Sequence, residues 1–281
     1  MTRTLFVAAL LLTAPRLLPA GTISIETSLN TEVGDTVKTR ISLRNLGTDP
    51  AHDVVPRARF GDEERTGALE STLPPHGSHE WTFEFPRPER KGRYALLATV
   101  AYTDPGFRAS SAVSAQLVDV GPKGAVFPLR VRGKMEPIDL ETDGDLVVNA
   151  EPEGAAPQAL VVGLLAPDEL GGWREVTRVE PSAGKPSKIT IPIHNNGALP
   201  GSNFPVYAIF RAEDGDHASA AMLVGTVAVS AALTSKWQAY LPYGAALAVA
   251  LYAAVEISLR LRGRRGVAPP ASQPETPPRR T

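Results

Sequence analysis

His76 and His79 form the one close histidine pair in the sequence, and they are the first residues to consider as metal ligands. A zinc site needs at least one further nitrogen, sulfur or carboxylate ligand near such a pair. The chain has no cysteine, and the two histidines flank Gly77 in a proline-glycine turn rather than standing at helical spacing. We therefore predict a surface turn here and no metal site.

Two Asp-Gly stretches, at residues 143–146 and 213–217, have the oxygen-rich composition that calcium prefers. Neither has the spacing of an EF-hand loop, and Asp-Gly is a frequent hairpin turn. We predict hairpins at both places, with calcium binding as the weaker alternative.

The sequence lacks the motifs of the common catalytic classes. It has no G-x-S-x-G elbow, no H-E-x-x-H helix, no phosphate-binding P-loop and no dinucleotide fingerprint before a helix. Its serines and histidines are scattered over predicted turns. We therefore predict that the protein is not an enzyme, has no catalytic residues and uses no cofactor.

Exposed aromatic rings are the remaining route to ligand binding, because sugars stack on tryptophan and tyrosine. Trp81 alternates with Phe83 and Phe85, which predicts that it lies in a core. Trp173 follows a Gly-Gly pair in a predicted loop, so it is the candidate binding aromatic, with a glycan as the candidate ligand.

The composition excludes some partners. The chain has a formal net charge of −1, and its central part is modestly acidic because many of its arginines lie near the C-terminus. A nucleic-acid binder would carry a basic surface, so we expect no nucleic-acid partner. With no cysteine, the domains must be held together by apolar cores rather than disulfides.

The middle of the chain alternates between apolar and polar residues, as half-buried strands do. Residues 37–43, 81–85 and 94–102 show this pattern most clearly, and turn residues such as Asp104-Pro105-Gly106 separate the segments. Strands of this length and spacing predict an all-β fold built from antiparallel β-sandwiches.

A repeat of one sandwich length predicts two tandem domains. Residues 205–229 align with residues 95–120, so that Val206 falls on Leu96 and Ala208 on Ala98. The predicted fold is therefore two Ig-like antiparallel β-sandwich domains in tandem, followed by a single C-terminal transmembrane helix.

Residues 22–121 resemble the CARDB and NEW3 kind of Ig-like bacterial adhesion domains. The shared pattern is an N-x-G turn, then an alanine and an Asp-Val pair, then a proline-glycine turn before an aromatic strand. Its residues here are Asn45, Gly47, Ala51, Asp53, Val54, Pro75, Gly77 and Gly92. The resemblance implies an Ig-like fold at the cell envelope and no catalysis, and it transfers no site residues.

Both ends of the chain predict export and anchoring. Arg3 precedes a short apolar run, and Ala20 offers a small residue at a cleavage position, which is typical of a signal peptide. Near the C-terminus, residues 239–259 are long and apolar enough, at ~1.5 Å per residue, to cross a bilayer.

The flanks of this apolar run predict its orientation. Aromatic residues that favour the headgroup level stand at one end and arginines at the other, as in cytoplasmic flanks. These predicted interface residues are Trp237, Tyr240, Tyr243, Arg260, Arg262, Arg264 and Arg265. Glu256 lies within a turn of the arginines and is the candidate for pairing inside the membrane.

The predicted organisation runs along the chain as six parts. They are a signal peptide (residues 1–20), Ig-like domain 1 (21–121), a linker (122–126), Ig-like domain 2 (127–232), a transmembrane helix (238–259) and a basic, proline-rich disordered tail (260–281). A sortase signal at Leu241-Pro242 is the weaker interpretation of the C-terminus, because the threonine of that motif is missing.

Together these features predict a single-pass type I protein of the cytoplasmic membrane, with its domains outside and its C-terminus in the cytoplasm. The leading functional prediction is a non-enzymatic envelope protein that contacts an envelope protein partner. The alternatives are a membrane-tethered carbohydrate-binding module or an auxiliary subunit of an envelope or exopolysaccharide complex, paired through Glu256.

Overall fold

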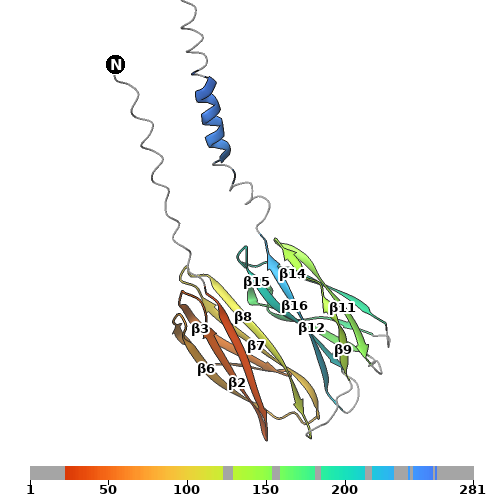
Figure 1. Ribbon diagram of the computed structural model, residues 1–281. Helices are drawn as coiled ribbons and strands as arrows, with labels where there is room; N and C mark the ends of the chain where they lie inside the picture. Colours follow the sequence, from red (N-terminus) through yellow and green to blue (C-terminus); the bar gives the residue numbers. More distant parts are fainter. Residues whose placement is uncertain are drawn as a thin grey trace, which may run out of the picture. The chain divides into compact units, whose positions relative to one another are not determined.

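The structure is a computed structural model. It describes residues 23–122, 129–153, 159–180, 185–212, 217–230, 240, 243–255 and 257. Within these residues the chain is almost entirely β-strand, which confirms the predicted all-β class (Figure 1). The chain divides after Ser230 into two units, and each is described separately below.

The first half of the larger unit forms two facing antiparallel sheets. One sheet has the order β1-β2-β6, and the other has the order β4-β3-β7-β8 with β5 pairing β3. The strands are β1 (Ile25–Val33), β2 (Thr36–Asn45), β3 (Ala51–Phe60), β4 (Glu63–Thr66), β5 (Glu70–Leu73), β6 (Ser78–Pro86), β7 (Gly92–Thr103) and β8 (Ala109–Val120).

Alternation of side chains explains why these sheets pack together. On β6, Trp81, Phe83 and Phe85 are buried while their neighbours are exposed, so the predicted core position of Trp81 is confirmed. The indole nitrogen of Trp81 donates to the carbonyl of Ala68 at 2.9 Å, which satisfies its one polar atom. The core between the two sheets therefore holds the aromatic face that the sequence pattern predicts.

The second half repeats this plan. One sheet has the order β14-β11-β9, and the other has the order β10-β16-β15-β12-β13, in which β10 runs parallel to β16. The strands are β9 (Arg130–Met135), β10 (Ile138–Leu140), β11 (Asp143–Glu153), β12 (Leu160–Leu165), β13 (Trp173–Val179), β14 (Ser187–His194), β15 (Asn203–Ala212) and β16 (Ser219–Val229), with a 3-10 turn at Asp168–Leu170.

Burial confirms the sequence repeat. Leu96 and Val206 both have no exposed surface, and Ala98 and Ala208 are buried in the same way, each in the core of its own sandwich. The strand pairs β7-β8 and β15-β16 that carry these residues occupy corresponding places in their sheets. The repeat is thus seen in the buried positions of the two sandwiches as well as in their residue types.

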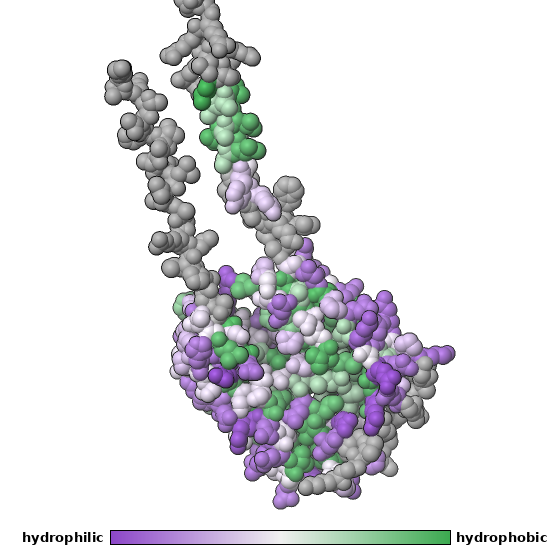
Figure 2. Space-filling view, viewed as in Figure 1, coloured by the Kyte–Doolittle hydropathy of each residue, from purple (hydrophilic) through white to green (hydrophobic). Residues whose placement is uncertain are grey.

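The two sandwiches pack through the outer faces of their larger sheets. Leu97 and Val113 from the first sandwich join Leu165 and Ile209 from the second in a separate apolar cluster. At one end of this interface, which we call the closed end, Gly92 forms a parallel bridge with Ala218. In Figure 2, hydrophobic side chains gather along the middle of this β-sandwich body, between more hydrophilic margins.

The smaller unit is helical at residues 243–255. In the part of the chain that the structure describes, no helix combines the length and the apolar character needed to cross a membrane. The predicted span at 238–259 falls partly outside the described residues, and so does the linker. The signal peptide and the tail lie outside the described residues completely. Those assignments and the domain boundaries stay predictions.

Candidate functional site

Trp173, the candidate binding aromatic, lies at the start of β13 rather than in a loop. The 3-10 turn before it ends at Gly171 and Gly172, whose φ angles of 103° and 63° are in the left-handed region. Glycine reaches this region without steric cost, so the chain reverses within two residues and enters the strand. The Gly-Gly pair that suggested a loop therefore marks a tight turn into a sheet.

The ring of Trp173 is half-buried between the two sandwiches. A Cβ atom built on Gly163 of the neighbouring strand would lie only 2.1 Å from the ring, so the indole rests directly on that glycine. The guanidinium of Arg59 lies over the ring, 5.9 Å from its centroid. These contacts leave less free ring surface for a sugar than an exposed loop tryptophan would offer.

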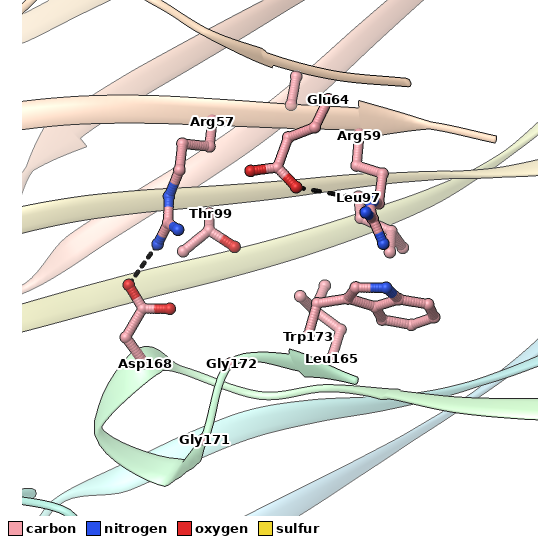
Figure 3. A pocket seen from close by; sticks show the side chains of 11 residues that line it. Arg57, Arg59, Glu64, Leu97, Thr99, Leu165, Asp168, Gly171, Gly172 and Trp173 are labelled. Carbon is pink, nitrogen blue, oxygen red and sulfur yellow. Dashed lines mark hydrogen bonds and ion pairs between the residues drawn. The ribbon is translucent and has the colours of Figure 1, made fainter. Parts of the chain in front are cut away.

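A cleft of about 330 Å³ opens beside Trp173 between the two larger sheets (Figure 3). Its charged side chains are paired with one another. Arg57 forms an ion pair with Asp168 across the interface, and Arg59 lies 3.4 Å from Glu64. Opposite charges therefore balance within the cleft, and the Arg57–Asp168 pair links the first sandwich to the second.

The most buried polar contact of the interface lies beside this cleft. Glu169 is only 8% exposed, and its carboxylate accepts hydrogen bonds from the backbone N–H of Ser111 at 2.9 Å and from the Ser111 hydroxyl at 2.8 Å. The Ser111 hydroxyl in turn accepts from the N–H of Asp168 at 2.7 Å. Because each buried polar group here has a partner, the contact fixes the turn at Asp168–Leu170 against the start of β8.

Tyr102 lies half-buried near the Ser111–Glu169 contact. Burial and, to a smaller extent, the nearby negative charge of Glu169 raise the pKa of its phenol to about 12, while a hydrogen bond with Ser110 opposes the shift. Burial also raises the pKa of Tyr207, which lies across the interface on β15. Both phenols therefore stay neutral through the physiological range.

The predicted histidine turn lies away from this interface. His76 has a positive φ of 60° and is exposed in a turn, while Nδ1 of His79 lies 3.2 Å from a carboxylate oxygen of Glu70. Asp143 and Gly144, in the first Asp-Gly stretch, belong to strand β11, and Asp143 contacts His194, so the hairpin turn predicted there is wrong. Residues 213–216 of the second stretch lie outside the described residues, so the hairpin there stays a prediction. Among the residues that the structure describes, no group of three histidines and carboxylates comes together in a way that could hold a metal.

The other predicted site residues belong to the C-terminal part. Tyr240 and Tyr243 are 67% and 73% exposed within the smaller unit. Trp237 and the four arginines lie outside the described residues, and nothing is described of the Glu256 side chain. Their assignment to a membrane interface stays a prediction.

Sequence reasoning missed the Ser111–Glu169 contact and the packing of one sandwich on the other. One signal was available, because the acidic pair Asp168-Glu169 stands between the apolar segment at residues 160–166 and a Gly-Gly turn. An acidic residue in such a short turn between strands is well placed to accept a hydrogen bond from the backbone N–H of a neighbouring segment. The sequence does not indicate which backbone that would be.

Comparison with known proteins gives no family for this chain. No protein-family model matches, and no curated protein matches. Among solved structures, red sea bream transglutaminase aligns with 13% identity and a TM-score of 0.25, and alpha-2-macroglobulin from Escherichia coli with 14% identity and a TM-score of 0.29. PorU from Porphyromonas gingivalis aligns with 16% identity and a TM-score of 0.24.

These alignments cover 74–75% of this chain but only 32%, 17% and 20% of the three neighbours, respectively. The chain thus spans a third or less of the length of each. Similarity at this level carries no statement about activity, so the function has to be argued from the chain itself.

Proposed function

We propose that this protein is a non-enzymatic envelope protein that displays two packed β-sandwiches outside the cytoplasmic membrane for contact with another protein. The N-terminal export pattern and the aromatic-apolar-arginine order near the C-terminus support this placement. The resemblance of residues 22–121 to CARDB and NEW3 domains supports the envelope setting and belongs to the same proposal.

The observation that carries the proposal is the way the two sandwiches are joined. Apolar side chains, the Arg57–Asp168 ion pair and the buried Glu169 carboxylate all link them. Tandem domains that only act as spacers need no such contacts, whereas a fixed pair presents one continuous surface to a partner.

Protease accessibility tests the placement directly. One epitope tag is inserted at residue 125, between β8 and β9 along the chain, and another follows Thr281. In spheroplasts treated with protease, we expect loss of the tag at residue 125 and protection of the terminal tag. A matched variant that lacks residues 2–20 should protect both tags, because the predicted export signal has been removed.

Protection of both tags in the complete chain would contradict export, and digestion of both would contradict a cytoplasmic C-terminus. The role of Glu256 is tested separately by Glu256→Leu. If the protein is an auxiliary subunit paired within the membrane, this substitution should abolish co-purification of its partner while the tag pattern stays the same.

A further inference from the structure

A groove lies between the two sandwiches, at the end opposite the closed end. It has a volume of about 810 Å³. The start of β8 (residues 110–114) forms one wall, and residues 202–207, at the start of β15, form the other. Ile23 and Glu169 also line it, so the groove opens beside the first described residue and includes the Ser111–Glu169 contact.

The internal repeat shows that the backbone bridge of the closed end has no counterpart at this end. In the sequence alignment Gly92 corresponds to Ser202 and Ala218 to Ala109, so a bridge like Gly92–Ala218 would here join residues 202 and 109. Ser202 carries a Cβ atom where Gly92 has none, and among the described residues no backbone hydrogen bond joins residues 201–203 to residue 109. The Ser111 N–H donates to the Glu169 carboxylate at 2.9 Å instead. A backbone bridge of the Gly92–Ala218 kind is therefore missing at this end.

The groove is acidic. Asp49, Asp104 and Glu169 contribute carboxylates to its lining, and the described lining residues include no lysine, arginine or histidine. Asp49 and Asp104 form no ion pair with any described residue, whereas the acidic residues in the Trp173 cleft do. Oδ1 of Asp104 accepts only a backbone hydrogen bond, from Arg108 at 2.9 Å. Uncompensated carboxylates in a groove attract a cationic ligand.

Aromatic side chains accompany these charges. Tyr102, Phe204 and Tyr207 line the groove. At its rim, next to the lining residue Gly106, Phe107 is 92% exposed and has a positive φ of 62°. A bulky residue in that backbone region is uncommon, and an exposed aromatic beside a groove is typical of a protein contact surface. Aromatic faces also bind lysine and arginine side chains.

We propose that this groove binds an extended, basic segment of a partner protein. The carboxylates of Asp49 and Asp104 pair with lysine or arginine side chains of the segment, and Phe107 packs against their aliphatic stems. The walls are strand ends, which favour an extended ligand that runs alongside β8. This inference rests on the proposed function, because it gives the chemistry of the partner that the displayed sandwiches contact.

Fluorescence anisotropy on the purified full chain in detergent micelles tests the inference. The probe is a fluorescein-labelled peptide of alternating lysine and threonine, about eight residues long, and the matched probe has glutamate in place of lysine. We expect the basic peptide to bind at least about tenfold more tightly than the acidic one, and its binding to weaken as salt is raised. The double variant D49N/D104N should weaken it about tenfold.

Matched variants show whether the groove is the site. Asp35→Asn removes an exposed charge from the β1-β2 turn at the far end of the sandwich, and it should leave binding unchanged. Phe107→Ser should weaken binding about fivefold, whereas Leu69→Ser, at a residue 58% exposed outside the groove lining, should not. Thermal melts of each variant establish that the fold is kept.

Absence of saturable binding, equal binding of the two peptides, or insensitivity to D49N/D104N would overturn the inference. Binding of chitohexaose that D49N/D104N removes, without peptide binding, would also overturn it and assign the groove to a neutral glycan. Because the assay uses micelles, it is independent of membrane orientation. A failed tag experiment therefore leaves this result standing, and a failed peptide experiment leaves the anchor proposal standing.

Discussion

The two ends of the interface between the sandwiches are built from corresponding strands, yet a backbone bridge joins the sandwiches at one end and is missing at the other. At the closed end, the N–H of Arg93 donates to the carbonyl of Ala218 at 3.0 Å, and the N–H of Ala218 donates to the carbonyl of Lys91 at 3.1 Å. At the groove end, a buried carboxylate takes the place of such a backbone bridge.

One side chain accounts for this difference. Gly92 has no Cβ atom, so the backbone of Ala218 can approach it directly. The corresponding residue at the groove end is Ser202, directly before β15, and its Cβ atom would stand in the way of an equally close approach. A tandem repeat can thus keep its cores while the backbone bridge is present at only one end of the interface.

The closed end should be the more sensitive to substitution. A Cβ atom on Gly92 would lie 2.2 Å from the carbonyl oxygen of Ala218, which is backbone and cannot move aside cheaply. We expect Gly92→Ala to lower the free energy of unfolding by about 3 kcal/mol, from overpacking and the loss of the backbone bridge. Urea unfolding followed by circular dichroism measures this change.

Gly34→Ala is the matched control for that substitution. Its Cβ would come no closer than 3.9 Å to any neighbour, so the free energy of unfolding should barely change. Equal losses in the two variants would show that Gly92 is not a special close approach and that the closed end does not hold the sandwiches together.

The groove end should be sensitive to alkaline pH. Because the pKa of Tyr102 rises from 10 to about 12 on folding, the unfolded chain releases this proton first as pH rises. The stability that the protonated Tyr102 phenol gives the folded chain is therefore fully present below pH 10. It is lost between about pH 10 and pH 12, which lowers the free energy of unfolding by about 2–3 kcal/mol.

Urea titrations at pH 9 and pH 11.5 measure that loss. Tyr102→Phe should reduce the difference in unfolding free energy between the two pH values, while Tyr240→Phe, at a residue 67% exposed, should leave it as in the parent chain. The same pH difference in the parent chain and in Tyr102→Phe would contradict a buried phenol beside Glu169.

Breaking the carboxylate contact at the groove end should cost somewhat less. Glu169→Gln keeps one acceptor oxygen for the Ser111 N–H but removes the negative charge and turns an amide N–H₂ toward the Ser111 hydroxyl, so the bond that this hydroxyl donates to the carboxylate is lost. We expect a loss of about 2 kcal/mol in unfolding free energy, measured by urea unfolding at neutral pH.

A double-mutant cycle shows whether that loss belongs to the contact. Combined with Ser111→Ala, the Glu169→Gln variant should give a coupling energy of about 1 kcal/mol. Strictly additive effects of the two substitutions would show that Glu169 and Ser111 do not act on each other.

The smallest effect should come from the ion pair in the Trp173 cleft. The side chains of Arg57 and Asp168 are 37% and 44% exposed, so solvent screens their attraction. We expect Arg57→Met to change the unfolding free energy by no more than about 1 kcal/mol, as measured by urea unfolding. A loss as large as that of Glu169→Gln would show that the cleft, rather than the groove end, carries the polar stability of the interface.

Much of each sandwich was predictable, because local patterns determine it. The alternation of Trp81, Phe83 and Phe85 predicts a buried strand face, and the repeat places Val206 where Leu96 stands. Positions that depend on long-range packing were not predictable. Whether Trp173 is exposed depends on Gly163 in the neighbouring strand, and the partner of Glu169 lies 58 residues away along the chain.

Fixed packing of one sandwich on the other underlies both the proposed function and the groove, and a distance measurement between the sandwiches tests it. The chain has no cysteine, so Arg44→Cys on β2 and Lys188→Cys on β14 provide two labelling sites, one on the outer sheet of each sandwich. Double electron–electron resonance on the labelled full chain should give one narrow distance distribution, which Gly92→Ala broadens. A broad distribution in the parent chain would contradict fixed packing, because it would show that the sandwiches move independently.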